Sequence, residues 1–231
     1  IVDYVKWKYS AYKKEIIPYD MRSDKSEQKF IGESKAFTNM KYIPEDLVTI
    51  NDFSYINTYP WAKVRKIILP DVYNLAKAYY QENGHKLSIA SAYRSYWFQS
   101  YLRKNTLDQL YVAKPWHSEH QAWLAIDISY KNQYLVDKDM DNMFSINYQW
   151  LMDNAYKFWR HNTYQKWEKI DWYLPEHRHR RFVGKDLATY LHNQNISLAQ
   201  YYKWFSYTLT TYLQHGILSR KLCLWIGLWK I

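Results

Sequence analysis

The sequence predicts an α+β fold in which helices flank a small and mainly antiparallel β-sheet. Short β-prone runs alternate with helical segments, but the regular strand–helix repeat of a doubly wound parallel sheet is missing. The chain has 231 residues and is 48% hydrophobic, which is enough for one domain with a sizeable core. We therefore expect a single folded domain with peripheral segments at its ends.

The chain divides into three parts by composition. Residues 1–40 are rich in Lys, Tyr and Ser without a sustained period, and we interpret them as a leader or linker. Residues 41–204 carry the periodic patterns and form the predicted domain. Residues 205–231 are apolar and aromatic, and this tail could pack as a helix or lie on a membrane surface. Because the chain begins at Ile1 rather than Met, an upstream signal or anchor could also be missing.

The first clear helix is predicted to begin with Asp71 as its cap and to end at Asn83-Gly84. Its apolar residues follow the i, i+3, i+4, i+7 spacing of one helix face: they are Val72, Leu75, Ala76 and Tyr79.

The later elements are assigned in chain order from the same signals. Strands are predicted over Leu87–Ala90 and Leu124–Ile128. Residues 91–99 should turn from the first of these strands into a second helix. Another helix should run from Ser145 to Phe158. Residues 173–183 read as a strand pair or an extended turn, followed by short helices over Asp186–Leu191 and Ser197–Trp204.

A divided set of polar residues predicts a metal site. His120 and Asp127 are seven positions apart, which fits a loop residue and a strand residue brought together by a turn. Asp127 lies between Ile126 and Ile128, where a buried carboxylate is costly unless it is paired or bound to a metal. A buried aspartate that accepts backbone hydrogen bonds remains the alternative.

About fifty residues later, Glu176 and His179 complete the set. His, Asp and His can hold zinc and leave a fourth position open, and Glu176 could then serve as general base for water at the metal. The alternative is a solvated basic strand, because His179 has arginines on both sides. In a regular strand Glu176 and His179 would point to opposite faces, so local periodicity leaves this geometry open.

The chain is basic, with a formal net charge of +10 and a pI near 9.3. This charge favours anionic surroundings, either nucleic acid or an anionic cell envelope. No zinc-finger, basic-zipper or stacking-platform motif is present, so we expect no nucleic-acid partner. Cys223 is the single cysteine, which excludes an intrachain disulfide and leaves the compartment open.

The order of motifs between Tyr42 and Tyr202 resembles the zinc D-alanyl-D-alanine carboxypeptidase family, which includes VanY-type enzymes and related L,D-carboxypeptidases. The segments that carry the resemblance are YIPEDLVTIN, SAYRSYWFQ, SEHQAWLAIDIS, WLMDNAYKF, FVGKDLATYL and ISLAQYY. The resemblance implies a hedgehog/DD-peptidase-like fold with Zn²⁺ as cofactor. It also implies a peptidoglycan stem peptide as substrate, met in the bacterial cell envelope or outside the cell.

The resemblance assigns roles residue by residue. His120, Asp127 and His179 would bind Zn²⁺, and Glu176 would act as general base and then protonate the leaving amine. Arg94, within SAYRS, would stabilise the oxyanion or hold a substrate carboxylate, as a planar guanidinium does well. The implied peptide-binding residues are Ser118 and Gln99.

Five tryptophans stand where the family usually has glycine: Trp116, Trp123, Trp159, Trp167 and Trp172. The chain has 12 Trp and only 5 Gly, whereas average usage would give about 16 Gly. Some bacterial codes read UGA as glycine and others read it as tryptophan, so translation with the wrong table would produce this pattern. The alternative is real divergence with a damaged or inactive site.

Two functions therefore remain. The first is a zinc-dependent carboxypeptidase that removes the C-terminal D-alanine from peptidoglycan stem peptides. The second is a non-catalytic, zinc-containing relative that binds cell-wall peptides or a protein partner. A non-catalytic module has no physical need for a glutamate beside an open zinc position, so we favour the enzyme.

Overall fold

The computed structural model describes residues 23–40, 42–129 and 145–203. The predicted apolar tail, Cys223 and the first 22 residues of the predicted leader lie outside these ranges. Among the described residues, no helix is both long and apolar enough to cross a membrane.

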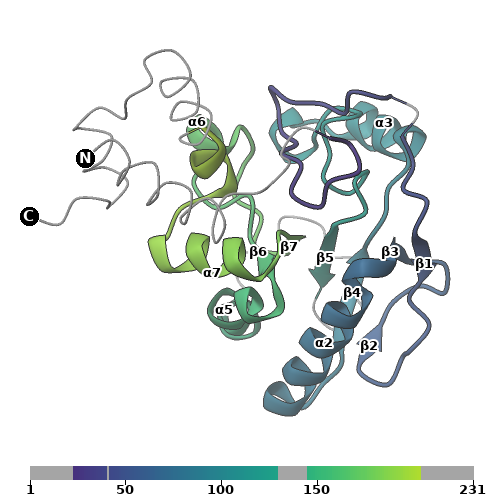
Figure 1. The fold of residues 1–231 in the computed structure, drawn as a ribbon, viewed down its shortest axis with the longest axis vertical. Helices are drawn as coiled ribbons and strands as arrows, with labels where there is room; N and C mark the ends of the chain where they lie inside the picture. The colour runs from purple at the N-terminus through teal and green to yellow at the C-terminus, as the bar shows by residue number, and fades with distance from the viewer. Residues whose placement is uncertain (1–22, 41, 130–144, 204–231) are drawn as a thin grey trace, which may run out of the picture.

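A five-stranded sheet lies at the centre of the fold, with the strand order β2-β4-β5-β7-β6 (Figure 1). Neighbouring strands pair antiparallel, except that β2 and β4 pair parallel. The strands are β2 (Ile56–Asn57), β4 (Leu87–Ser91), β5 (Ala125–Ser129), β7 (His179–Phe182) and β6 (Arg160–His161). A separate antiparallel pair is formed by β1 (Leu47–Thr49) and β3 (Lys63–Arg65). The predicted α+β fold with a small, mainly antiparallel sheet is confirmed.

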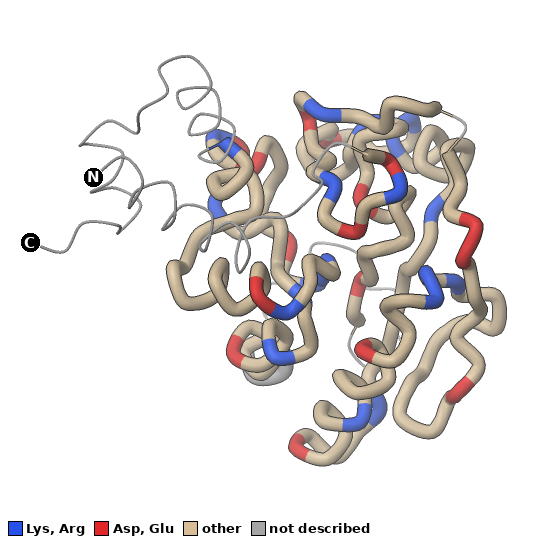
Figure 2. Tube along the Cα trace, viewed as in Figure 1, with Lys and Arg blue, Asp and Glu red and all other residues tan. Residues whose placement is uncertain are grey.

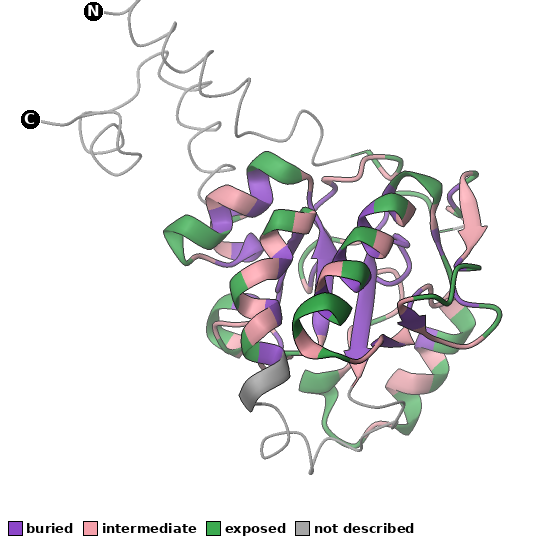
Figure 3. Cartoon of the chain, turned by 90° about the horizontal axis from the view of Figure 1, so that it is seen from below, coloured by how far each residue is buried: buried purple, intermediate pink, exposed green. Residues whose placement is uncertain are grey.

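Three longer helical segments cover one face of this sheet (Figure 3). They are α2 (Leu69–Asn83), α5 (Ser145–Asn154) with its 3₁₀ extension η4 (Ala155–Phe158), and α7 (Lys185–Gln194). The remaining elements are η1 (Lys66–Ile68), α3 (Tyr96–Asn105), η2 (Gln109–Tyr111) and α6 (Glu168–Asp171). Residues 198–203 are also helical. Strands β6 and β7 are buried throughout, and β5 is buried except at Ser129.

Helix α2 confirms the predicted apolar face, since Val72, Leu75, Ala76 and Tyr79 are all buried. Its start differs from the prediction, because the helix begins at Leu69 and Asp71 lies in its first turn rather than at its cap. The preceding turn η1 runs directly into α2, and Pro70 fits the first turn because its missing N–H has no helical partner there. Gly84 closes the helix in the left-handed conformation, with φ 73°.

The other predicted elements are found with small shifts. Strands β4 and β5 lie within one residue of the predicted ranges. The helix predicted through Phe158 ends as α5 at Asn154 and continues as η4. In the region read as a strand pair or an extended turn, only β7 is a strand, and its antiparallel neighbours are β5 and β6.

Packing extends further towards the N-terminus than the patterns predict. Phe30, Ile31 and Phe37 are buried, and they join two hydrophobic clusters, one under β4, β5 and α2 and the other around α7. These residues belong to the segment interpreted as a leader, so the packed structure includes part of it. Lys and Arg are mixed with Asp and Glu over the described trace (Figure 2).

Candidate metal centre

The centre is built on a pair of residues that face each other across two strands. Asp127 in β5 lies directly opposite His179 in β7 in the antiparallel register. The flanking Ile126 and Ile128 are buried in the hydrophobic cluster on the helix side of the sheet. Alternation along the strand therefore turns Asp127 to the opposite face, where it meets His179.

His120 reaches this pair from a turn that precedes β5. The turn is held by successive backbone hydrogen bonds, in which the amides of Gln121, Ala122 and Trp123 donate to the carbonyls of Ser118, Glu119 and His120. The predicted combination of a loop residue and a strand residue is therefore correct.

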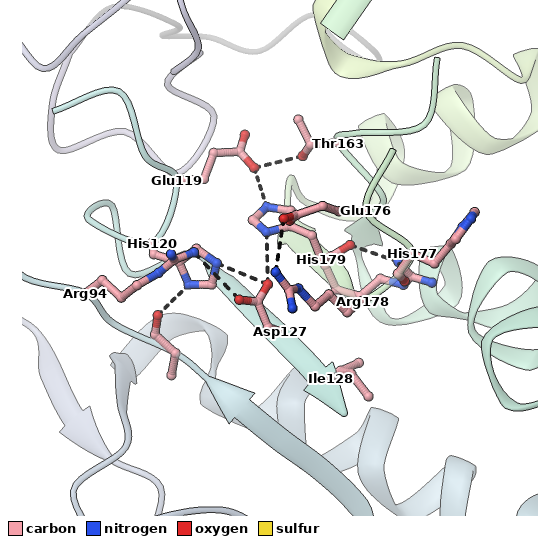
Figure 4. A network of polar contacts seen from close by, with 12 residues as sticks. Arg94, Glu119, His120, Asp127, Ile128, Thr163, Glu176, His177, Arg178 and His179 are labelled. Carbon is pink, nitrogen blue, oxygen red and sulfur yellow. Dashed lines mark hydrogen bonds and ion pairs between the residues drawn. The ribbon is translucent and has the colours of Figure 1, made fainter. Parts of the chain in front are cut away.

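Ligand atoms of His120, Asp127 and His179 lie within 4.8 Å of one another, and all three residues are buried (Figure 4). His120 Nε2 and His179 Nδ1 are each 3.2 Å from the same carboxylate oxygen of Asp127. Two imidazole nitrogens and a carboxylate oxygen around one point form a set that divalent zinc accepts. The residues therefore fit the metal that the sequence implies.

The outer nitrogen of each histidine is held in place by an acceptor. His120 Nδ1 donates to the carbonyl of Ala92 at 2.6 Å, and His179 Nε2 lies 2.7 Å from the Glu119 carboxylate. Such contacts fix the ring orientation of metal ligands and leave the other nitrogen free to bind.

Glu119 contacts the candidate ligand His179 and was missed by the sequence reasoning. Its side chain is fully buried, accepts a hydrogen bond from Thr163 at 2.8 Å and forms an ion pair with Arg181 at 3.1 Å. The sequence signal that could have identified Glu119 is its position directly before His120 in the SEHQ run. A glutamate that is buried next to a ligand requires a partner.

The two histidines of the centre differ in pKa, and therefore in charge near pH 7. Burial lowers the pKa of His120 to about 4, so this ring is neutral near pH 7. Burial also opposes protonation of His179, but hydrogen bonds to Asp127 and Glu119 outweigh it and raise the pKa of His179 to about 9. Burial raises the pKa of Asp127, but His120, the hydrogen bond to His179 and the nearby Arg94 hold it well below its usual range.

Glu176 lies on the same side of the sheet as His179 because β7 starts with a turn. Residues 177 and 178 form that turn, and the amide of His179 lies 3.4 Å from the carbonyl of Glu176. The open question of strand alternation is thereby settled. The Glu176 carboxylate accepts a hydrogen bond from Arg178 at 3.2 Å.

A small cavity of about 20 Å³ joins the predicted residues. Its lining includes two of the ligands and all the other predicted site residues: Arg94, Gln99, Ser118, His120, Glu176 and His179. Three tyrosines that the sequence reasoning did not include also line it, namely Tyr111, Tyr164 and Tyr173. Arg94 lies 3.6 Å from the Asp127 carboxylate, and the Gln99 amide donates to the carbonyl of Ala113.

Behind the sheet, two arginines are buried without full pairing. Arg160 and Arg180 are each 1% exposed and line a cavity of about 520 Å³ between α5, η4 and α7. None of the three guanidinium nitrogens of Arg160 has a hydrogen-bond partner. This cavity lies on the helix side of the sheet, whereas the metal centre lies on the other side.

The fold and the site together define an α+β protein with a buried His/Asp/His group that could hold a metal ion. The family described as VanY, D-alanyl-D-alanine carboxypeptidase, matches residues 62–185. This match covers more than half of the chain, and the protein therefore belongs to the VanY-type zinc carboxypeptidase family.

Individual relatives agree with this assignment. YodJ of Bacillus subtilis (strain 168), which is named as a carboxypeptidase, is 31% identical over 176 residues. The match covers 70% of this chain and 62% of YodJ, so the chain spans less than two thirds of that relative's length.

Two solved structures share the architecture. The LdcB LD-carboxypeptidase aligns with a TM-score of 0.64 and 29% identity, over 75% of this chain and 84% of LdcB. The D,D-pentapeptidase VanY of a VanB-type vancomycin resistance cassette, solved with Zn(II), aligns with a TM-score of 0.58 and 23% identity. That alignment covers 76% of this chain and 98% of VanY, and at this identity it shows the shared fold.

Proposed function

We propose that the protein is a zinc-dependent carboxypeptidase of the D-Ala-D-Ala type, which removes the C-terminal D-alanine from peptidoglycan stem peptides. The observation that carries the proposal is the convergence of two distant segments on one centre. His120 and Asp127 meet His179 there, and Glu176 and Arg94 line the adjoining cavity.

Zinc, when bound by His120, Asp127 and His179, would supply a Lewis acid that polarises the scissile carbonyl and acidifies water. Glu176 would accept the proton from the attacking water and deliver it to the leaving amine of the C-terminal residue. The Glu176 carboxylate is not part of the ligand cluster, which supports a role in proton transfer rather than in holding the metal.

Arg94 supplies fixed positive charge on the other side of the centre. Its guanidinium faces Asp127, and its Nε is buried without a hydrogen-bond partner. A guanidinium with unused donors can bind the terminal carboxylate of the substrate or the oxyanion that forms at the scissile carbonyl. Ser118 and Gln99 line the same cavity and would bind the peptide backbone.

Substrate class and location follow from the family and the charge. LdcB is described as recognising peptidoglycan, and a related VanY structure was solved with D-alanine-D-alanine. Both points support a wall peptide as the substrate here, and the net charge of +10 favours an anionic cell envelope. The protein would then act in the bacterial envelope or outside the cell.

One observation favours the alternative of a non-catalytic, zinc-containing relative. The cavity beside the ligands is small, about 20 Å³, which is room for about one water molecule. A protein with so small a cavity at the centre would hold the metal and bind wall peptides or a partner protein elsewhere on its surface.

Incubation of the zinc-loaded protein with stem pentapeptide and tetrapeptide, followed by mass spectrometry, tests the proposal. Release of one D-alanine from the pentapeptide is the expected result. Release from the tetrapeptide alone would reassign the bond as L,D. The control is Glu176→Gln, which should keep zinc and lose at least the ~10²–10⁴ in rate that a general acid–base group supplies. Zinc content of one per chain without cleavage of either peptide would favour the non-catalytic alternative.

A further inference from the structure

Among the residues that the structure describes, backbone with positive φ is occupied mainly by tryptophan. Eight described residues have positive φ, and these are two glycines, Asn195 and five tryptophans. The tryptophans are Trp116, Trp123, Trp159, Trp167 and Trp172, with φ between 62° and 74°. A bulky residue in this region is a clear outlier, because its Cβ collides with the backbone. The other three described tryptophans, at 61, 97 and 150, have ordinary negative φ.

Two of the five close helical turns in the way that glycine does. Gly84 ends α2 with φ 73° and ψ 5°. Trp172 ends α6 with φ 65° and ψ −2°, and Trp159 ends η4 with φ 63° and ψ 22°. A left-handed residue at this position is usually glycine, because glycine has no Cβ. The three helix ends therefore use the same backbone device, with two different residue types.

The clearest comparison between a tryptophan and a glycine is that of Trp167 with Gly184. It precedes α6 with φ 74° and ψ 164°, and Gly184 precedes α7 with φ 82° and ψ 160°. This part of conformational space is open essentially to glycine alone. Packing does not explain the choice, because Trp167 is 63% exposed and its indole therefore gains little from burial.

At the metal centre, the indole of Trp123 is crowded. Trp123 ends the turn that carries His120, and its ring lies 3.3 Å from the ring of Tyr93, centroid to centroid. Stacked aromatic side chains normally keep centroids about 4.5–7 Å apart. The indole nitrogen of Trp123 is buried without a hydrogen-bond partner, although such groups usually find one.

From these conformations we propose that the protein made by its own host carries glycine at positions 116, 123, 159, 167 and 172. The codons at these positions would be UGA, decoded as glycine. The 12 tryptophans and 5 glycines of the printed sequence become 7 and 10 on this basis, which is closer to ordinary usage.

Glycine at these positions would change the surroundings of the candidate metal centre. Glycine at 116 and 123 would remove two indoles that stack on Tyr96 and Tyr93, next to the SAYRS segment that carries Arg94. The turn that holds His120 would keep its left-handed residue without a Cβ. The backbone at positions 116 and 123 therefore already has a conformation that glycine adopts without strain.

Peptide mass spectrometry of the protein purified from the organism that encodes it tests the proposal, together with the codons of its gene. Glycine in the peptides that cover these five positions, with UGA in the gene, is the expected result. Tryptophan with UGG at any of the five overturns the assignment for the set. Positions 97 and 150 are internal controls, which should be tryptophan.

A matched pair of variants tests the conformational argument independently of the codons. Trp167→Gly and Trp97→Gly both remove an exposed indole, since the two residues are 63% and 78% exposed. Trp167→Gly should raise Tm by roughly 2–12 °C, because it relieves a left-handed residue. Trp97→Gly should lower Tm, because glycine weakens the helix α3. A lower Tm for Trp167→Gly would contradict the argument.

Discussion

Glu119→Gln tests how much Glu119 contributes to the metal centre, because it changes none of the three proposed ligands. The substitution keeps the size of the side chain and one acceptor oxygen, but it removes the negative charge that faces His179 and Arg181. Loss of a carboxylate behind a metal-bound histidine typically lowers metal affinity 10–100-fold. The amide oxygen can still accept from His179 Nε2, so we expect a loss near tenfold, or about 1.4 kcal/mol.

The same change should destabilise the fold, because it leaves Arg181 buried without its ion-pair partner. Removing one member of a buried pair costs about 3–5 kcal/mol. Arg181 keeps hydrogen bonds to the backbone carbonyls of Phe182, Glu27 and Lys29, which places the expected loss near the lower end. At this chain length, about 3 kcal/mol corresponds to a fall in Tm of roughly 6–12 °C.

Competition with a chromophoric chelator measures the zinc affinity, and thermal unfolding of the metal-free protein measures the stability. Thr163→Val is the matched control, because Thr163 donates a single hydrogen bond to Glu119 and carries no charge. It should cost about 1 kcal/mol of stability and change zinc affinity much less. If Glu119→Gln binds zinc as tightly as the parent protein, Glu119 does not support the ligand and the reasoning is wrong.

Three further predictions concern the metal centre, and a fourth concerns the buried Arg160 on the other side of the sheet. His120→Ala should abolish stoichiometric zinc and Cys223→Ser should not; tight zinc in the first variant would exclude the site. Arg94→Ala should slow peptide cleavage and leave zinc content unchanged, and an unchanged cleavage rate would remove Arg94 from the mechanism. Zinc binding near pH 7 should release about one proton, because the raised pKa of His179, about 9, keeps it protonated in the metal-free protein; equal calorimetric enthalpies in buffers of different protonation enthalpy would contradict this. Arg160→Met should stabilise the protein by about 1–4 kcal/mol in denaturant unfolding, since a buried guanidinium without a hydrogen-bond partner is replaced by an apolar chain; destabilisation would indicate that an anion, such as the nearby Asp71 carboxylate, pairs with Arg160.

The ligand spacing was the part of the site most accessible from the sequence. An aspartate between two isoleucines, seven residues after a histidine, predicted a strand residue and a loop residue on one centre, and the structure places them so. The position of Glu176 was not accessible, because the sequence does not show that β7 begins at His179 after a turn. The carboxylate of Glu119 was missed since its partners Thr163 and Arg181 come from segments more than forty residues away.

For the fold, periodic segments were predictable and aperiodic ones were not. Helix α2 has a regular apolar face and was found, with an error of three residues at its start, since the cap is Ile68 rather than Asp71. The strands β2 and β6 have two residues each, which is too short for any alternation to appear. Phe30 and Ile31 have no periodic neighbours and still pack into the two clusters, because long-range contacts place them there.

The assignment of the three ligands can be tested most directly by an anomalous difference map at the zinc edge from crystals of the zinc-loaded protein. The predicted result is one peak at about 2.0–2.2 Å from His120 Nε2, a carboxylate oxygen of Asp127 and His179 Nδ1, with Glu176 outside the coordination shell. A peak bound by other residues, or none at this centre in protein that contains zinc, would contradict the account.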